Sequence, residues 1–181
     1  TNLRANIDEA FTRRLDAVVD FPVPDEEHRR RLWEQCLGPR APRGGDLDHV
    51  ITLDATVTGR EKRSYWRAVY KRYSAPGQAG RQFLVAAAGG RVRGFIIGEV
   101  RDWEFGSAPC GWVFAIDVEP DFRLAGIGTR LLKAICASFR RAGVTKVRTM
   151  HARDNTLILS FFRSQGMMAG PFLPLEMDLV D

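Results

Sequence analysis

The stretch Ile116-Asp-Val-Glu-Pro-Asp-Phe-Arg-Leu-Ala-Gly-Ile-Gly-Thr-Arg-Leu-Leu132 decides the expected fold. An apolar strand should end at Val118, because Pro120 follows as a breaker. A long helix is expected over residues 126–142, with Gly143 as its stop. Its apolar positions repeat every fourth residue, which is the spacing of one helix face: Ile127, Leu131, Ile135 and Phe139.

The loop between this strand and this helix predicts an anion site. The amides of a helix's first turn have no intrahelical acceptor, and the helix dipole adds partial positive charge there. Gly126 and Gly128 leave room for a phosphate to approach the backbone, and Arg123 adds a fixed positive charge. The dinucleotide fingerprint and the Walker loop are both absent. A pyrophosphate site is therefore expected, with a tight turn that serves only packing as the alternative.

The surrounding sequence predicts a mixed α/β sheet flanked by helices. Strand-like runs at residues 82–88 and 91–100 flank a Gly-Gly pair, which indicates a hairpin. Further elements are expected along the chain, namely a short helix or turn at 46–53, a helix at 59–73, strands at 111–118 and 144–152, a helix at 155–165, and one or two strands at 168–180.

Composition limits the classes of protein that remain. The 181 residues are 45% hydrophobic and 27% charged, as in globular domains, and no apolar run is long enough for a membrane span. The net charge of +5 favours a polyanionic partner, and a phosphorylated cofactor meets that need. No nucleic-acid-binding signature appears, so nucleic acid is not an expected partner. The three cysteines are scattered, which predicts no metal site and a cytoplasmic protein.

Two motifs in this order resemble those of the Gcn5-related N-acetyltransferases (GNAT). The first is the segment 118–132, and the second is Asn155-Thr-Leu-Ile-Leu-Ser-Phe-Phe-Arg-Ser-Gln-Gly-Met167. The resemblance covers residues 46–181 and implies a GNAT fold, with acetyl-CoA as co-substrate. It implies an enzyme that transfers the acetyl group to a primary amine by direct attack. The alternative is a non-catalytic acyl-CoA-binding or regulatory module.

The resemblance also implies roles for individual residues. The backbone of Ile116, Asp117 and Val118 would bind the pantetheine arm as an added strand. Asn155 would hydrogen-bond the same arm, and Phe162 would lie beside the thioester. The pyrophosphate would lie against Arg123, Leu124, Ala125, Gly126, Ile127, Gly128 and Thr129. A backbone amide near Val118 would polarise the acetyl carbonyl.

The usual positions for an acid and a base are apolar in this chain. Phe162 replaces a proton-donating Tyr, while Met150 and Trp112 fall at two positions where relatives carry a base. The candidate catalytic residues are therefore His151, Asp117 and Glu104. Strand alternation is expected to turn His151 to the opposite face.

The acceptor, a small molecule or a protein, is expected to contact the segment before the hairpin. Asp54, Arg60 and Tyr65 form a polar and aromatic group there that suits a cationic amine. Helix capping and core packing are the alternative roles for these side chains. A homodimer is left open.

The N-terminal part of the chain resembles a different family. Residues 1–43 are similar to a fragment of AAA+ ATPases that runs from the sensor to the lid region, although no Walker segment is present. We therefore expect two parts. Residues 1–45 would form a mostly helical N-terminal appendage with a linker, and residues 46–181 the N-acetyltransferase domain.

Overall fold

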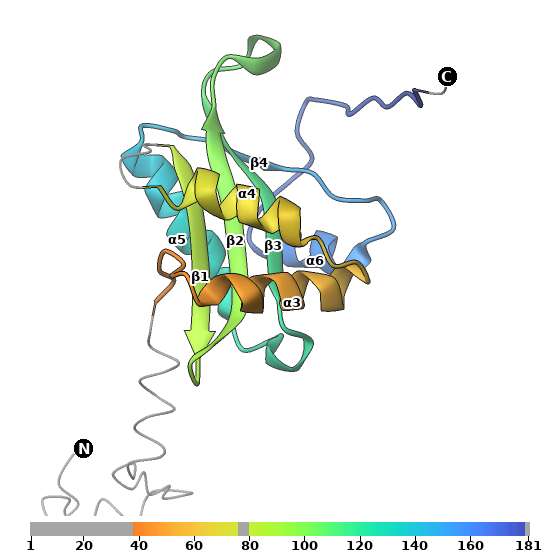
Figure 1. Cartoon of the computed structure of the whole chain (residues 1–181). Coiled ribbons are helices and arrows are strands. Elements are labelled where there is room, and N and C mark those ends of the chain that lie inside the picture. Colours follow the sequence, from red (N-terminus) through yellow and green to blue (C-terminus); the bar gives the residue numbers. More distant parts are fainter. Residues whose placement is uncertain (1–37, 76–79, 180–181) are drawn as a thin grey trace, which may run out of the picture. The chain divides into compact units, whose positions relative to one another are not determined.

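The computed structural model of the chain describes residues 38–75 and 80–179. Its centre is a four-stranded sheet in the order β1 (Arg81–Ala88), β2 (Arg91–Arg101), β3 (Cys110–Val118) and β4 (Val147–Thr149). The pairs β1–β2 and β2–β3 are antiparallel, whereas β4 is parallel to β3 (Figure 1). The mixed α/β sheet expected from the sequence is confirmed.

Helices cover both faces of the sheet (Figure 1). On one face lie α3 (Asp46–Thr58) and α4 (Arg63–Tyr73), and on the other lies α5 (Ile127–Arg141). The pleat of β2 serves both layers, because Phe95 and Ile97 belong to the core under α3 and α4 while Ile96 belongs to the core under α5. The last helix, α6 (Thr156–Ser164), follows β4.

Two short 3-10 helices complete the connections. η2 (Glu104–Gly106) lies between β2 and β3, and η3 (Pro120–Phe122) follows β3. The hairpin turn between β1 and β2 uses Gly89 and Gly90 at φ angles of 59° and 73°, a conformation that favours glycine. The expected hairpin is therefore present at the expected glycines.

Some boundaries differ from the expectation. The first helix continues to Thr58, and the next begins only at Arg63, because Gly59 ends α3 in the left-handed region at φ 70°. Arg40 pairs with Val85 through two backbone hydrogen bonds of 2.8 and 3.0 Å. The described domain thus includes residues ahead of Asp46.

The strands expected at residues 168–180 are absent from residues 168–179, so that expectation was wrong. Those residues are exposed and have no strand partner, and their anchor is Phe172, which packs on Arg148 and Phe105. A strand needs a neighbouring strand for its hydrogen bonds, and apolar alternation alone does not supply one. The expected N-terminal appendage lies almost wholly outside the described residues.

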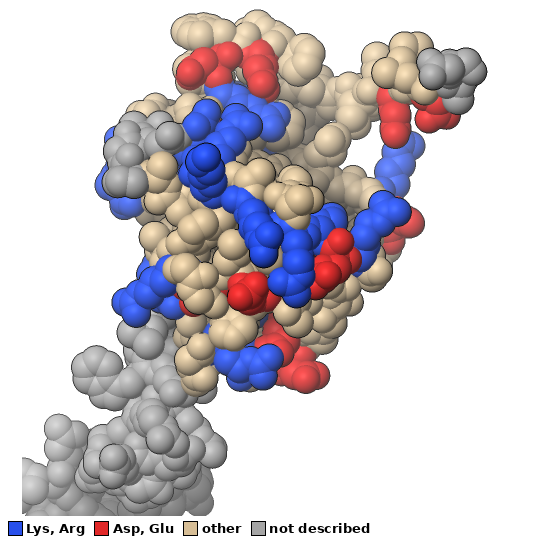
Figure 2. All heavy atoms as spheres, viewed as in Figure 1, with Lys and Arg blue, Asp and Glu red and all other residues tan. Residues whose placement is uncertain are grey.

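The positive charge of the chain is concentrated in part on α4. This helix has no acidic residue and exposes Arg63, Arg67, Lys71 and Arg72. Figure 2 shows basic side chains gathered on the face that α3 and α4 cover, with acidic ones among them.

Among the described residues, no helix has the length and apolar character that crossing a membrane requires.

Candidate functional site

The site begins where β3 and β4 diverge. The two strands pair only from Gly111 to Val113, and the Thr149 hydroxyl then donates a hydrogen bond of 2.9 Å to the Val113 carbonyl. The register against β2 skips Phe114, which marks a bulge at the same level. Beyond it, residues 115–118 pair with β2 on one side and with no described strand on the other. This half of β3 is therefore a free edge.

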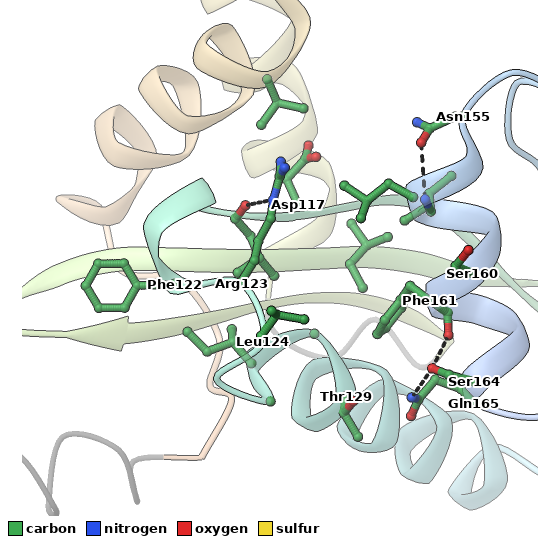
Figure 3. Close-up of a pocket in the computed structure, with 18 residues that line it drawn as sticks. Asp117, Phe122, Arg123, Leu124, Thr129, Asn155, Ser160, Phe161, Ser164 and Gln165 are labelled. Carbon is green, nitrogen blue, oxygen red and sulfur yellow. Dashed lines mark hydrogen bonds between the residues drawn. The ribbon is translucent and has the colours of Figure 1, made fainter.

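A groove of about 510 Å³ runs from this free edge to the start of α5, with α6 as its other wall (Figure 3). Of the residues expected to bind the cofactor, all but Ala125 and Phe162 line it: Ile116, Asp117, Val118, Arg123, Leu124, Gly126, Ile127, Gly128, Thr129 and Asn155. The structure thus brings together two sequence segments that were identified separately.

Sequence reasoning missed the α6 wall of this groove. Leu157, Ser160, Phe161 and Ser164 line it from one face of the helix. Their spacing of three and four residues is the signal that would have found them, since such positions share a helix face.

The start of α5 leaves its first amides available to a ligand. Gly126 is the N-cap, at φ 75°, and no side chain caps the helix. A methyl group at Gly128 would lie 3.1 Å from the ring of Phe161, so even the smallest side chain there would press on the α6 wall of the groove. Leu124 also adopts a positive φ, 65°, with its side chain fully exposed. The geometry suits a pyrophosphate held by backbone amides.

Three predicted cofactor residues have contacts that the sequence did not indicate. Arg123 Nε donates a hydrogen bond of 3.3 Å to the Val118 carbonyl, so the side chain lies across the end of β3 (Figure 3). Asn155 Oδ1 accepts a hydrogen bond of 3.1 Å from the Ile158 amide, which caps α6. Phe162 is only 4% exposed and belongs to the core under α5.

A second pocket of about 490 Å³ lies between the α3–α4 layer and residues 149–152. We call it the acidic pocket, because Asp54 and Asp117 line it. It shares four lining residues with the groove: Ile116, Asp117, Asn155 and Ile158. The two spaces therefore meet at the end of β3.

Asp54 is a buried charge with two partners. Its side chain accepts hydrogen bonds from Trp66 Nε1 at 2.8 Å and from Lys62 Nζ at 3.0 Å. Trp66 is itself buried in the core under α3 and α4. Buried carboxylates persist when they are paired in this way, and Asp54 with Lys62 forms an ion pair in the wall of the pocket.

Asp117 has an unusual environment. Burial raises its pKa to about 6, and the negative charge of Asp54 acts in the same direction, while Arg123 and Lys62 oppose the change. A carboxylate with this pKa can take and release a proton near neutral pH. It lines both the groove and the acidic pocket.

The other predicted site residues divide between those in the acidic pocket and those outside it. Tyr65 and His151 line the pocket, whereas Arg60 and Glu104 do not. The expectation that strand alternation turns His151 away was wrong, because β4 ends at Thr149 and alternation no longer applies. Its Nδ1 lies 2.8 Å from the Ala152 carbonyl.

Glu104 lies far from the meeting point of the two spaces. It belongs to η2, ahead of the first residue of β3, whereas Asp117 lies near the last. Its nearest charged partner is Arg101, at 3.9 Å. Within residues 38–75 and 80–179, no group of three His, Cys, Asp or Glu side chains has the arrangement of a metal site.

The structure thus joins a mixed sheet, two parallel strands that separate beyond Val113, and a helix start that no side chain caps. The model of the acetyltransferase (GNAT) family matches residues 50–167, and the chain belongs to this family. The resemblance of residues 1–43 to an AAA+ ATPase fragment finds no such support, and residues 1–37 lie outside the described part.

Solved structures share the fold at low sequence identity. Aminoglycoside N-acetyltransferase AAC(6')-Iy in complex with CoA is 19% identical, with a TM-score of 0.68 over 77% of this chain and 93% of that one. Aminoglycoside 6'-N-acetyltransferase AAC(6')-IG from Acinetobacter haemolyticus is 16% identical, with a TM-score of 0.67 over 80% and 100%. A transcriptional regulator from Bacillus halodurans C-125 is 15% identical, with a TM-score of 0.66 over 78% and 98%. A search of curated protein sequences found no match.

Proposed function

We propose that this protein transfers the acetyl group of acetyl-CoA to a primary amine by direct attack. The observation that carries the proposal is the meeting of the groove and the acidic pocket at Ile116 and Asp117. A donor in the groove and an acceptor in the pocket would approach each other there without a covalent enzyme intermediate. Such an approach supplies the orientation on which a two-substrate reaction depends.

The groove fits acetyl-CoA by shape and chemistry. The free edge of β3 offers backbone groups to the amides of the pantetheine arm, which would lie along it as a strand does. The uncapped start of α5 offers amides to the pyrophosphate, with Arg123 nearby. Only the Nε–H of Arg123 is engaged by the Val118 carbonyl here, and the other guanidinium N–H groups remain to contact a phosphate. The solved relative AAC(6')-Iy in complex with CoA supports this assignment.

The acidic pocket fits a cationic acceptor. Two carboxylates, Asp54 and Asp117, face a space that also includes the ring of Tyr65. Negative charge and an aromatic face both stabilise an ammonium group. The aminoglycosides named for two of the structural neighbours are amines of this class, which supports a polar, amine-rich small molecule as acceptor.

Asp117 is the residue that we assign as general base. An ammonium must lose a proton before it attacks, and the pKa of about 6 leaves Asp117 ionised and able to accept one at neutral pH. A backbone amide near Val118 would stabilise the charge that develops on the carbonyl oxygen. Phe162 has no proton to give, so solvent would protonate the departing thiolate.

The alternative is a non-catalytic acyl-CoA-binding module. It is favoured by the apolar side chains at the usual acid and base positions, of which buried Phe162 and exposed Met150 both line the acidic pocket. The free thiols of Cys110 and Cys136 agree with a reducing compartment, and we place the activity in the cytoplasm.

The deciding experiment follows thiol release from acetyl-CoA in the presence of a panel of primary amines, including aminoglycosides and linear polyamines. The enzyme assignment predicts release that depends on an amine and that falls by about 10²–10⁴-fold in Asp117→Asn. A melting temperature raised by acetyl-CoA, with no amine acetylated, would instead establish the binding module.

A further inference from the structure

One primary amine of the protein already lies in the acidic pocket. The chain has four lysines, Lys62, Lys71, Lys133 and Lys146. Only Lys62 lines the groove or the acidic pocket, whereas the other three are exposed elsewhere on the surface. Lys62 is the residue before α4, in the short segment that joins α3 to α4.

The contacts of Lys62 are those expected of a bound ammonium ligand. Its Nζ donates a hydrogen bond of 3.0 Å to Asp54 and lies 5.9 Å from the centre of the Tyr65 ring. The side chain is 34% exposed, so the amine remains open to the space of the pocket. A carboxylate and an aromatic ring thus hold the Lys62 ammonium as they would hold that of an acceptor.

The same pocket supplies the groups that the reaction needs. Lys62 shares it with Asp117 and with the backbone at Ile116, beside which the thioester would lie. The positive charge of Lys62 acts to lower the pKa of Asp117, against the larger effects of burial and of Asp54, which raise it. A lysine side chain has a flexible four-carbon stem, and rotation of that stem is the movement by which Nζ would exchange Asp54 for Asp117 as its partner.

We propose that Lys62 is itself an acceptor, and that the protein acetylates it when no other amine occupies the acidic pocket. This proposal rests on the proposed acetyl transfer. Asp117 takes one proton from the ammonium, and the neutral nitrogen forms a bond to the acetyl carbon while the carbon–sulfur bond breaks. The nitrogen loses a second proton as the amide forms. One of the two protons ends on the CoA thiolate and the other in solvent.

The modification would alter the pocket in two ways. Acetyl-lysine carries no charge, so Asp54 would lose its ion pair and keep only the hydrogen bond from Trp66. The added amide would also occupy the space in which an acceptor binds. Acetylation of Lys62 therefore closes the acidic pocket, and an acceptor amine protects Lys62 by occupying it first.

The test uses the full chain with acetyl-CoA and no added amine, followed by mass spectrometry and peptide mapping over time. The exposed Lys71, Lys133 and Lys146 are internal controls for uncatalysed chemical acetylation. We expect Lys62 to be acetylated first, at a rate that saturates with acetyl-CoA and that free CoA inhibits. Equal or faster acetylation of the three exposed lysines, or a Lys62 rate that is linear in acetyl-CoA and insensitive to CoA, would overturn the proposal.

Two variants sharpen the result. Asp117→Asn should slow acetylation of Lys62 by about 10²-fold or more and leave the exposed lysines unchanged. Lys62→Arg keeps a cation beside Asp54 and should take up no acetyl group in the pocket. If external amines are acetylated while Lys62 stays unmodified, only this proposal fails. If neither CoA binding nor amine acetylation occurs, the proposed function fails with it.

Discussion

The environment of Asp117 predicts that Asp117→Asn stabilises the protein while it removes activity. Burial and the charge of Asp54 disfavour the ionised form of this carboxyl in the folded protein, whereas in the unfolded chain solvent surrounds it. The amide of Asn has a similar shape and no charge. The variant therefore keeps the packing and removes the cost of the charge.

The size of the effect follows from the pKa difference. The pKa rises from the usual 3.8 to about 6, so the folded state binds the proton more tightly than the unfolded state. At about 1.4 kcal/mol per pKa unit, ionisation costs up to about 3 kcal/mol, and residual solvent screening lowers this to about 1–2 kcal/mol. The stability that protonated Asp117 contributes is complete below about pH 4 and is lost as the pH rises through about 6.

The assay is denaturant unfolding of the wild type and of Asp117→Asn at pH 4 and at pH 7.5, with the exposed Asp121→Asn as the matched control. The free energy of unfolding of Asp117→Asn should exceed that of the wild type at pH 7.5 and approach it at pH 4. A variant that is equally stable or less stable at pH 7.5 would refute the reasoning about burial.

Three further predictions concern the groove and its support. Leu124 has a positive φ of 65° and an exposed side chain, so Leu124→Gly should relieve backbone strain without loss of packing. Thermal denaturation should then show a free energy of unfolding raised by about 1 kcal/mol. An unchanged melting temperature would count against strain in this loop. Gly111→Ala places a methyl group in steric overlap with the edge of the buried Phe139 ring, so the free energy of unfolding should fall by about 1–3 kcal/mol. Gly170→Ala, whose methyl group would contact nothing, should lower it by almost nothing, and equal losses would contradict the packing account. Arg123→Ala removes a positive charge from the groove, so the KM for acetyl-CoA should rise. The same charge lowers the pKa of Asp117, so its removal should move the acid limb of the kcat/KM profile to higher pH. A limb that moves to lower pH would contradict the assignment of Asp117 as the base.

The strand-to-helix segment around Gly126 was predictable because its signals are local. Proline ends a strand, glycine permits a positive φ, and apolar residues at every fourth position mark a helix face. The mixed sheet followed from these elements and from the Gly-Gly hairpin. The two motifs also identified most of the groove, because its residues are consecutive in the sequence or adjacent in one helix turn.

The acidic pocket was less predictable because its partners are distant in sequence. Asp54 and Tyr65 were identified from their chemistry, but nothing local indicates that Lys62 pairs with Asp54 or that both face Asp117 on β3. His151 was misjudged because the end of β4 at Thr149 depends on where the two parallel strands separate. The apolar alternation after residue 168 led to strands that the structure lacks, because a pattern does not provide a pairing partner.

Calorimetric titration with acetyl-CoA tests the central claim, that the groove between β3, α5 and α6 binds this co-substrate. The wild type should bind one acetyl-CoA per chain, and Gly128→Leu should bind none while it keeps its fold by circular dichroism, because its side chain would meet Phe161 in the narrow part of the groove. A wild type that binds no acetyl-CoA, or a folded Gly128→Leu that binds it equally well, would contradict the account.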